Sequence, residues 1–284
     1  METDGATSCI WKEARRLDFG ASRELIRRAL ACEQKNTLLY FPLRARAEPL
    51  RMLFRYARVP IADEIVPLAA WPELKSQMPN KKLPQLRHAD GNLLPETIDI
   101  ALHVANERGE SLVPSSRVAA LAAEECWREM HGSAVPYLAN PWAPNVPWDA
   151  RIGACNPLLN MLQEDEALPL IPGYLQGARA WMQGLAERID ESQAPFFGGS
   201  TPHHGDFASF HLANQITTLD GGESLMSCGM KVQLWYHSVS FLPAVAEYLA
   251  VRPQAGTGDV GMPGSLLFEH ANIAAVVAKA ATLR

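Results

Sequence analysis

The stretch LLYFPLRARAEPLR, from Leu38 to Arg51, contains the first group of side chains that could do chemistry. Tyr40 lies at the end of a short apolar run, and arginines, prolines and a glutamate follow it. A tyrosine hydroxyl is a poor base near pH 7 but a good hydrogen-bond donor. Aimed at a bound thiol, it would stabilise the thiolate. The stretch is therefore either a solvated, charged turn into a helix or one wall of a site for an anionic ligand.

The elements that must hold Tyr40 can be predicted from the spacing of apolar residues. Short strands are predicted at residues 37–41 and 64–66, around Leu86 and at Leu93–Leu94, with Asp90-Gly91 as the hairpin turn between the last two. Apolar residues at helical spacing predict helices after Pro49 and from Ile98 to Ala105. This order of strands and helices is that of a thioredoxin-like domain.

From about residue 115 onward no strand pattern recurs, and the apolar spacing predicts helices only. These helices are expected at 116–131, 151–163, 173–190, 206–218, 224–237 and 242–251. We therefore predict an α/β domain followed by an all-α domain. The expected divisions are a helical extension at 1–36, the thioredoxin-like domain at 37–110, the all-helical domain at 111–252, and a linker and tail helix at 253–284.

Composition excludes several classes of protein. The 284 residues carry a net charge of −5, which argues against a general nucleic-acid binder. The five cysteines are odd in number and form no Cys-x-x-Cys, so neither a disulfide framework nor a zinc module is predicted. The turn after Tyr40 has no cysteine, which excludes thiol–disulfide exchange there. With no long apolar run and no secretory signal, we expect a cytoplasmic protein without a membrane span.

Four stretches carry a resemblance to one family. LLYFPLRARAEPLRMLF resembles the start of a cytosolic glutathione transferase. AAWPELKSQMPNKKLPQL (69–86) and DGNLLPETIDIALHVA (90–105) resemble stretches of the sigma class, which includes glutathione-dependent prostaglandin D synthases. FLPAVAEYLAVRP (241–253) resembles the last core helix of the family's second domain. The resemblance implies the two-domain fold, glutathione as co-substrate, a hydrophobic electrophile, no metal and a homodimer.

The resemblance also implies roles for particular residues. Tyr40 would activate the glutathione thiol, with Phe41 beside it and Arg46 behind it. The remaining glutathione contacts would come from Trp71, Lys75, Lys81, Lys82, Leu83, cis Pro84, Glu96 and Thr97. Glutathione has two carboxylates and one ammonium group, so lysines, a helix N-terminus and an acid suit it. Taken singly, these residues are more typical of packing, a solvated face and a plain helix start; their joint order favours the site.

Some residues depart from the family pattern. Ala45 and Asn80 stand where glycine is frequent, and Pro95 precedes the acid. The helix at 206–218 normally opens with Ser/Thr-x-x-Asp, but here it reads His203-His204-Gly205-Asp206, so a hydroxyl cap is missing unless His203 replaces it. These departures keep open an alternative in which the fold serves as a non-catalytic module that binds a partner protein.

The second substrate is the part that the sequence constrains least. The resemblance places Trp127, Met130 and Tyr137 near the expected pocket wall. Trp142 lies in a proline-rich loop that is either an apolar lid or a rigid surface excursion. His203, His204 and His211 suggest a metal only weakly, because no acid pair or cysteine lies nearby. Arg51 and Arg55 are expected to face solvent.

Overall fold

A small mixed sheet forms the first half of the fold in the computed structural model, which describes residues 36–41, 45–66, 70–108, 112–131, 171–189, 195–219 and 221–252. Its strands are β1 (Thr37–Tyr40), β2 (Ala62–Ile65), β3 (Gln85–Arg87) and β4 (Leu93–Pro95), in the order β2-β1-β3-β4. β1 is parallel to β2 and antiparallel to β3, and β3 is antiparallel to β4. All four strands lie where the apolar pattern predicted them, within one or two residues.

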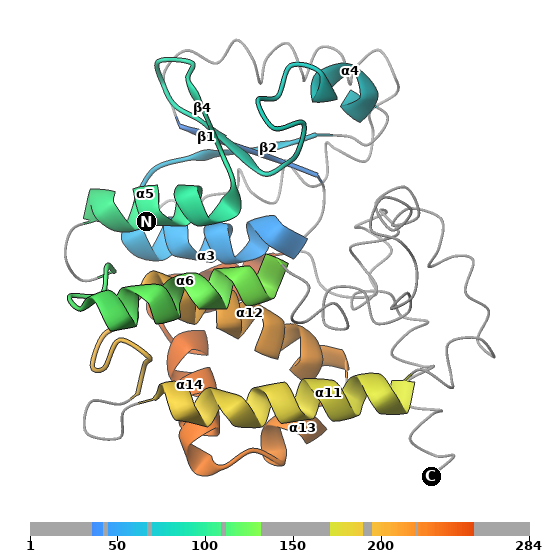
Figure 1. Ribbon diagram of the computed structural model, residues 1–284, viewed down its shortest axis with the longest axis vertical. Helices are drawn as coiled ribbons and strands as arrows, with labels where there is room; N and C mark the ends of the chain where they lie inside the picture. Colours follow the sequence, from blue (N-terminus) through green and yellow to red (C-terminus); the bar gives the residue numbers. More distant parts are fainter. Residues whose placement is uncertain are drawn as a thin grey trace.

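Helices α3 (Glu48–Ala57) and α5 (Thr97–Arg108) lie under this sheet, between it and the helical half of the molecule (Figure 1). A short 3₁₀ turn, η1 (Ala45–Ala47), leads into α3, and Pro49 stands in the first turn of α3. Leu50, Leu53 and Phe54 are buried and form its core-facing stripe. A short helix, α4 (Trp71–Lys75), was not predicted. Pro72 suits its first turn, where a missing N–H is no loss.

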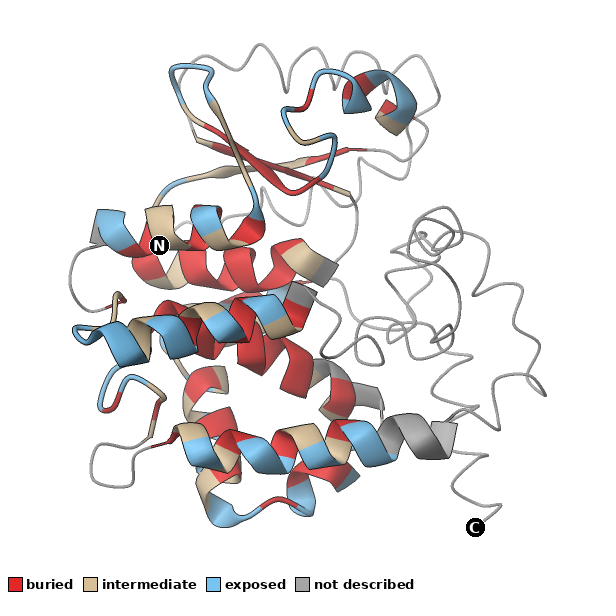
Figure 2. Cartoon of the chain, viewed as in Figure 1, coloured by how far each residue is buried: buried red, intermediate tan, exposed pale blue. Residues whose placement is uncertain are grey.

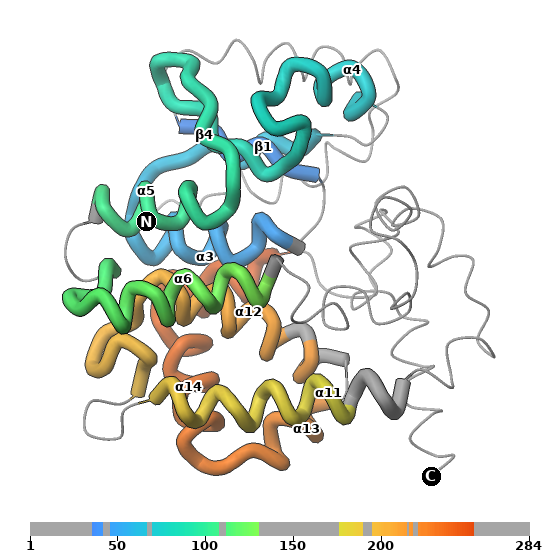
Figure 3. The backbone as a smooth tube through the Cα atoms, viewed as in Figure 1, coloured from blue at the N-terminus to red at the C-terminus, as the bar shows by residue number. Residues whose placement is uncertain are grey.

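The rest of the described chain is helical. Its elements are α6 (Arg117–His131), α11 (Ile171–Gly184), η3 (Leu185–Arg188), α12 (His204–Leu219), α13 (Glu223–Met226), α14 (Met230–Ser240) and α15 (Pro243–Val251). Buried residues gather on α3 and α12 (Figure 2). Helix α12 packs against both α6 and α3, which are far from it in sequence (Figure 3). Among the described helices, none is long and apolar enough to cross a bilayer.

One helix predicted from the sequence is interrupted in the structure, and others lie outside the described residues. The single helix expected at 224–237 is wrong: α13 ends at Met226 and α14 begins at Met230. Gly229 precedes α14 with an extended backbone, φ −61° and ψ 157°, which interrupts the helix. The helices expected at 1–36, 151–163 and 253–284 lie outside the described residues.

Helix α12 starts with a capping box in which a histidine replaces the usual hydroxyl residue. The Gly205 amide donates to His203 Nδ1 at 3.0 Å, and the His203 amide donates to the Asp206 carboxylate at 2.9 Å. This reciprocal pattern satisfies two amides at the start of the helix. His203 Nδ1 also lies 3.3 Å from Asp206 Oδ2.

Candidate functional site

The strand register brings three predicted site segments to the same end of the sheet. Leu39 is opposite Gln85, and Gln85 is opposite Pro95. Continuing both registers past the paired residues places Tyr40–Phe41, Leu83–Pro84 and Glu96–Thr97 next to one another. Because β3 begins at Gln85, the backbone of Leu83 lies beyond the ladder. Segments 40–41, 83–84 and 96–97 thus meet, although they are widely separated in sequence.

A row of aromatic rings joins Trp71 to Tyr40. The Tyr40 and Phe41 ring centroids are 5.6 Å apart, and Phe41 meets Trp71 edge-on at 5.3 Å. Trp71 is half-buried and begins α4, whereas Lys75 is exposed and ends it. Edge-to-face contacts of this kind fix the relative orientation of rings. The structure therefore places α4, with its lysine, beside the segment that carries Tyr40.

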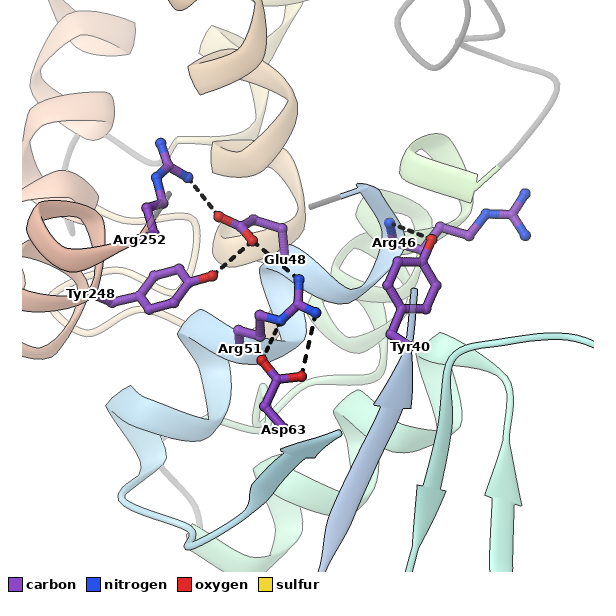
Figure 4. Close-up of polar contacts among 7 residues, drawn as sticks. All are labelled: Tyr40, Arg46, Glu48, Arg51, Asp63, Tyr248 and Arg252. Carbon is purple, nitrogen blue, oxygen red and sulfur yellow. Dashed lines mark hydrogen bonds and ion pairs between the residues drawn. The ribbon is translucent and has the colours of Figure 1, made fainter. Parts of the chain in front are cut away.

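The Tyr40 hydroxyl is held by the start of the following helix. Tyr40 is buried, and its oxygen accepts a hydrogen bond from the Arg46 amide at 3.3 Å (Figure 4). This bond uses a lone pair of the oxygen and not the hydroxyl hydrogen. A donor to the oxygen stabilises negative charge there, which makes the hydroxyl a stronger donor to a thiolate. Arg46 thus acts on Tyr40 through its backbone amide.

The loop before β3 and the start of α5 have uncommon backbone conformations. The Leu83–Pro84 bond is cis, as expected. Lys81 and Glu96 have φ values of 56° and 67°, which are uncommon for residues other than glycine. Asn80 links the two segments, since its Nδ2 donates to Glu96 Oε1 at 2.8 Å and its Oδ1 accepts from the Lys82 amide at 3.1 Å. Asn80, noted in the sequence only as a departure, is therefore part of the scaffold of this site.

Thr97 presents an unsatisfied hydroxyl at the N-terminus of α5. The residue is 1% exposed, and its Oγ1 has no hydrogen-bond partner among the described residues. A buried hydroxyl without a partner costs free energy, so it indicates a missing acceptor or donor. A carboxylate at the start of a helix would supply that partner and gain from the helix dipole. Exposed Lys81 and Lys82 lie on the nearby loop.

Arg51 does not face solvent, so that prediction is wrong for Arg51, whereas Arg55 is half-buried. Arg51 is 2% exposed and donates to Asp63 from Nε at 2.7 Å and from Nη2 at 3.3 Å. Its guanidinium lies 5.9 Å from the Tyr40 ring centroid. Burial lowers the pKa of Arg51, but the carboxylates of Asp63 and Glu48 help raise it above its ordinary value. Arg55 lies over the Tyr248 ring at 5.3 Å.

Glu48 is a buried carboxylate to which the sequence assigned no role. It is 0% exposed and accepts from the Tyr248 hydroxyl at 2.8 Å and from Arg252 at 2.7 Å (Figure 4). Arg51 Nη1 lies 3.5 Å from the same carboxylate. These contacts join the first turn of α3 to α15. Burial and Glu48 raise the pKa of the Tyr248 phenol well above its ordinary value, so Tyr248 remains a donor.

The residues predicted to line a second-substrate pocket are only partly described. Trp127 is fully buried and donates from Nε1 to His204 Nδ1 at 2.9 Å. Met130, one helical turn away on α6, is also buried. This placement favours a role in core packing over lining a pocket. Tyr137 and Trp142 lie outside the described residues.

The histidines at the start of α12 have structural partners. Burial lowers the pKa of His204 to about 3, with a smaller contribution from His203, so His204 is neutral near pH 7. In the parts of the chain that the structure describes, no group of three histidine, cysteine or acidic residues could hold a metal ion.

Comparison with known proteins identifies relatives that match about a quarter of the chain. It is 42% identical over 72 residues to "Probable glutathione S-transferase 6" of Caenorhabditis elegans and 40% identical over 75 residues to "S-crystallin SL18" of Nototodarus sloanii. These segments are 25% and 26% of this chain. The chain spans only 24% to 36% of the length of the first four curated relatives it matches. No family model matches.

A longer alignment and the solved structures cover more of the chain. It is 27% identical over 222 residues to the hematopoietic prostaglandin D synthase of Homo sapiens, covering 76% of this chain and 96% of that one. The structure "rat hPGDS complexed with a quinoline" matches with a TM-score of 0.57 and 20% identity, covering 78% and 98%. The monomeric Na-GST-3 of Necator americanus matches with the same TM-score and coverages at 18% identity. The chain therefore has the fold of the glutathione transferases, and its sequence is similar to proteins named glutathione S-transferase and hematopoietic prostaglandin D synthase.

Proposed function

We propose that this protein is a sigma-like glutathione transferase in which Tyr40 activates the thiol of glutathione. The observation that carries the proposal is the Tyr40 oxygen, which is buried at the end of β1 and accepts the Arg46 amide at 3.3 Å. The Tyr40 hydroxyl then donates to the thiolate sulfur, which favours the ionised thiol near neutral pH. The thiol proton leaves to solvent.

The surrounding residues complement the rest of glutathione. The unsatisfied Thr97 hydroxyl and the N-terminus of α5 bind the γ-glutamyl carboxylate. Glu96 pairs with the α-amino group, and the Leu83 backbone pairs with the cysteinyl unit. Trp71 and Lys75 hold the glycyl end, with Lys81 and Lys82 adding positive charge. These contacts orient the sulfur toward the second substrate.

The second substrate is a hydrophobic electrophile. The thiolate sulfur attacks an electrophilic carbon and a carbon–sulfur bond forms. In a substitution the displaced electron pair leaves with the leaving group, and in an addition it moves to an acceptor atom that then takes a proton from solvent. Isomerisation would use the same thiolate and regenerate it. In peroxide reduction the thiolate would take one peroxide oxygen and release the alcohol, and a second glutathione would then reduce the sulfenic acid to the disulfide and water. We further propose that glutathione binds the domain at 37–110, that 111–252 forms the helical domain, and that the protein is a cytoplasmic homodimer. Gel filtration tests the dimer.

A second candidate is a binding or structural module that keeps the fold without turnover. The similarity to proteins named S-crystallins favours keeping this candidate. It predicts a protein whose fold is stable but whose conjugation rate, if any, does not depend on Tyr40. The candidate is a direct alternative to the transferase, because both share the same fold.

The deciding experiment compares the wild type, Tyr40→Phe and Tyr56→Phe on immobilised glutathione and in a panel of glutathione-dependent assays. Tyr56 is a half-buried tyrosine of α3 whose ring packs on Phe207 at 5.4 Å, so it controls for loss of a hydroxyl. We expect Tyr40→Phe to stay bound to glutathione but to lose about 10- to 100-fold in kcat/KM, the usual worth of a hydrogen bond to a charged group. Retention of all three proteins without a Tyr40-dependent rate would favour the module.

A further inference from the structure

Glu48 stands where it can control the hydrogen bond to Tyr40. The amide that donates to the Tyr40 oxygen belongs to Arg46, in η1, and Glu48 is the first residue of α3, directly after that turn. Backbone atoms two residues apart in a helical turn move together. Any contact that fixes Glu48 therefore also fixes the Arg46 amide.

Helix α15 supplies those contacts from the far end of the sequence. The Tyr248 hydroxyl donates to Glu48 Oε2 at 2.8 Å, and Arg252 donates to Glu48 Oε1 at 2.7 Å. Arg252 also donates to Asn214 Oδ1 on α12 at 2.7 Å. All but Asn214 are buried. Two helices of the helical half thus hold the first turn of α3.

Arg51 continues the connection to the Tyr40 ring. It lies one turn after Glu48 on α3, bridges Glu48 and Asp63, and places its guanidinium 5.9 Å from the centroid of that ring. Two carboxylates, Glu48 and Asp63, and two guanidinium groups, Arg51 and Arg252, make this cluster formally neutral. Its effect on Tyr40 therefore depends on where the groups are held rather than on a net charge.

We propose that Glu48 and Arg51 are positioning residues for Tyr40, and that Tyr248 of α15 and Arg252, directly after this helix, hold them in place. The helical half, which contributes no group to the bond at the Tyr40 oxygen, thereby sets the strength of that bond. The effect of this inference on catalysis rests on the proposed function. The coupling between α15 and Tyr40 does not depend on the proposed function.

The substitution Tyr248→Phe tests the coupling, because it removes one donor to Glu48 and keeps the ring under Arg55. We expect a roughly three- to tenfold lower kcat/KM with the KM for glutathione unchanged, the effect of weakening one hydrogen bond. The pH profile of kcat/KM should move to higher pH by about 0.5 to 1 unit. Glu48→Gln, which keeps the shape but not the charge, should move the profile in the same direction.

Trp181→Phe is the matched control. Trp181 donates from Nε1 to Glu129 at 3.3 Å, and Glu129 is also paired with Arg188, just as Glu48 is paired with Arg252. This cluster joins α6, α11 and η3 and contacts neither Tyr40 nor Arg46 among the described residues. We expect Trp181→Phe to lower stability to a similar degree and to leave the pH profile unchanged.

A titration without glutathione separates this inference from the proposed function. The ultraviolet absorbance of tyrosinate, taken as the difference between each protein and its Tyr40→Phe counterpart, reports the ionisation of Tyr40 alone. Tyr248→Phe should move this ionisation to higher pH, and Trp181→Phe should not. Identical curves for the wild type and Tyr248→Phe would overturn the inference, even if the wild type proves to be an active transferase. A shift in an inactive wild type would support the coupling while the proposed function fails.

Discussion

The Thr97 hydroxyl offers a test of glutathione binding at the scale of one residue. It is buried at the start of α5 and has no partner among the described residues. Thr97→Val keeps the shape of the side chain and removes only the hydroxyl. We expect glutathione affinity to fall by roughly tenfold, as for a lost hydrogen bond to a carboxylate, with no loss of thermal stability. Isothermal titration and a melting curve measure the two quantities.

Thr37→Val is the control for this substitution, since Thr37 of β1 is also buried and its hydroxyl accepts a hydrogen bond from Arg87 at 3.1 Å. It should lower the melting temperature and leave glutathione affinity unchanged. A Thr97→Val protein that binds glutathione as tightly as the wild type would contradict the assigned role.

For single residues, the spacing of apolar residues predicted the positions that are set by the nearest strand or helix. The positions of Tyr40, Pro84 and Thr97 follow from strands and a helix start that can be recognised within a few residues. The environment of Arg51 could not be predicted in this way. Its partner Asp63 is on a neighbouring strand, and its partner Glu48 is neutralised from α15, so its burial depends on contacts that apolar spacing does not encode.

At the scale of the element, the start of α12 depends on His203. His203→Ala removes the acceptor for the Gly205 amide and should lower the free energy of unfolding by about 1 kcal/mol. His203→Ser should recover most of this loss, because a hydroxyl can accept the same amide. Urea unfolding measures both. If alanine and serine cost the same, the capping role of His203 is wrong.

The prediction of helices failed where backbone and packing outweighed apolar spacing. Residues 224–237 carry enough apolar residues for one helix, yet the chain breaks before Met230 at Gly229, which has an extended conformation. Gln233 Nε2 donates to the Cys228 carbonyl at 2.8 Å and satisfies a group that the break leaves outside the helix. Such compensation involves a side chain in the next helix, so the break was not evident from the spacing.

At the scale of the molecule, the Glu48 cluster is a polar junction inside an otherwise apolar interface. Helices α3, α12 and α15 meet around it, and its partners lie about 200 residues apart in sequence. Removing a carboxylate together with its guanidinium partner leaves no unpaired buried charge, whereas removing one of them does. The junction can therefore be tested by comparing single and double substitutions.

Arg252→Met leaves the buried Glu48 carboxylate without its closest guanidinium, and we expect a loss of about 3 to 5 kcal/mol in the free energy of unfolding. Adding Glu48→Met removes the unpaired buried charge and should restore part of that stability, although Arg51 then keeps only Asp63 as a partner.

Arg128→Met is the matched control. Arg128 is also 2.7 Å from a glutamate, Glu124, but is 52% exposed, so its substitution should change the free energy of unfolding by no more than about 0.5 kcal/mol. Urea unfolding of Arg252→Met, Glu48→Met, the double variant, Arg128→Met and the wild-type chain measures the coupling. If the double substitution is as unstable as the sum of the two single ones, α15 does not hold α3 through this pair.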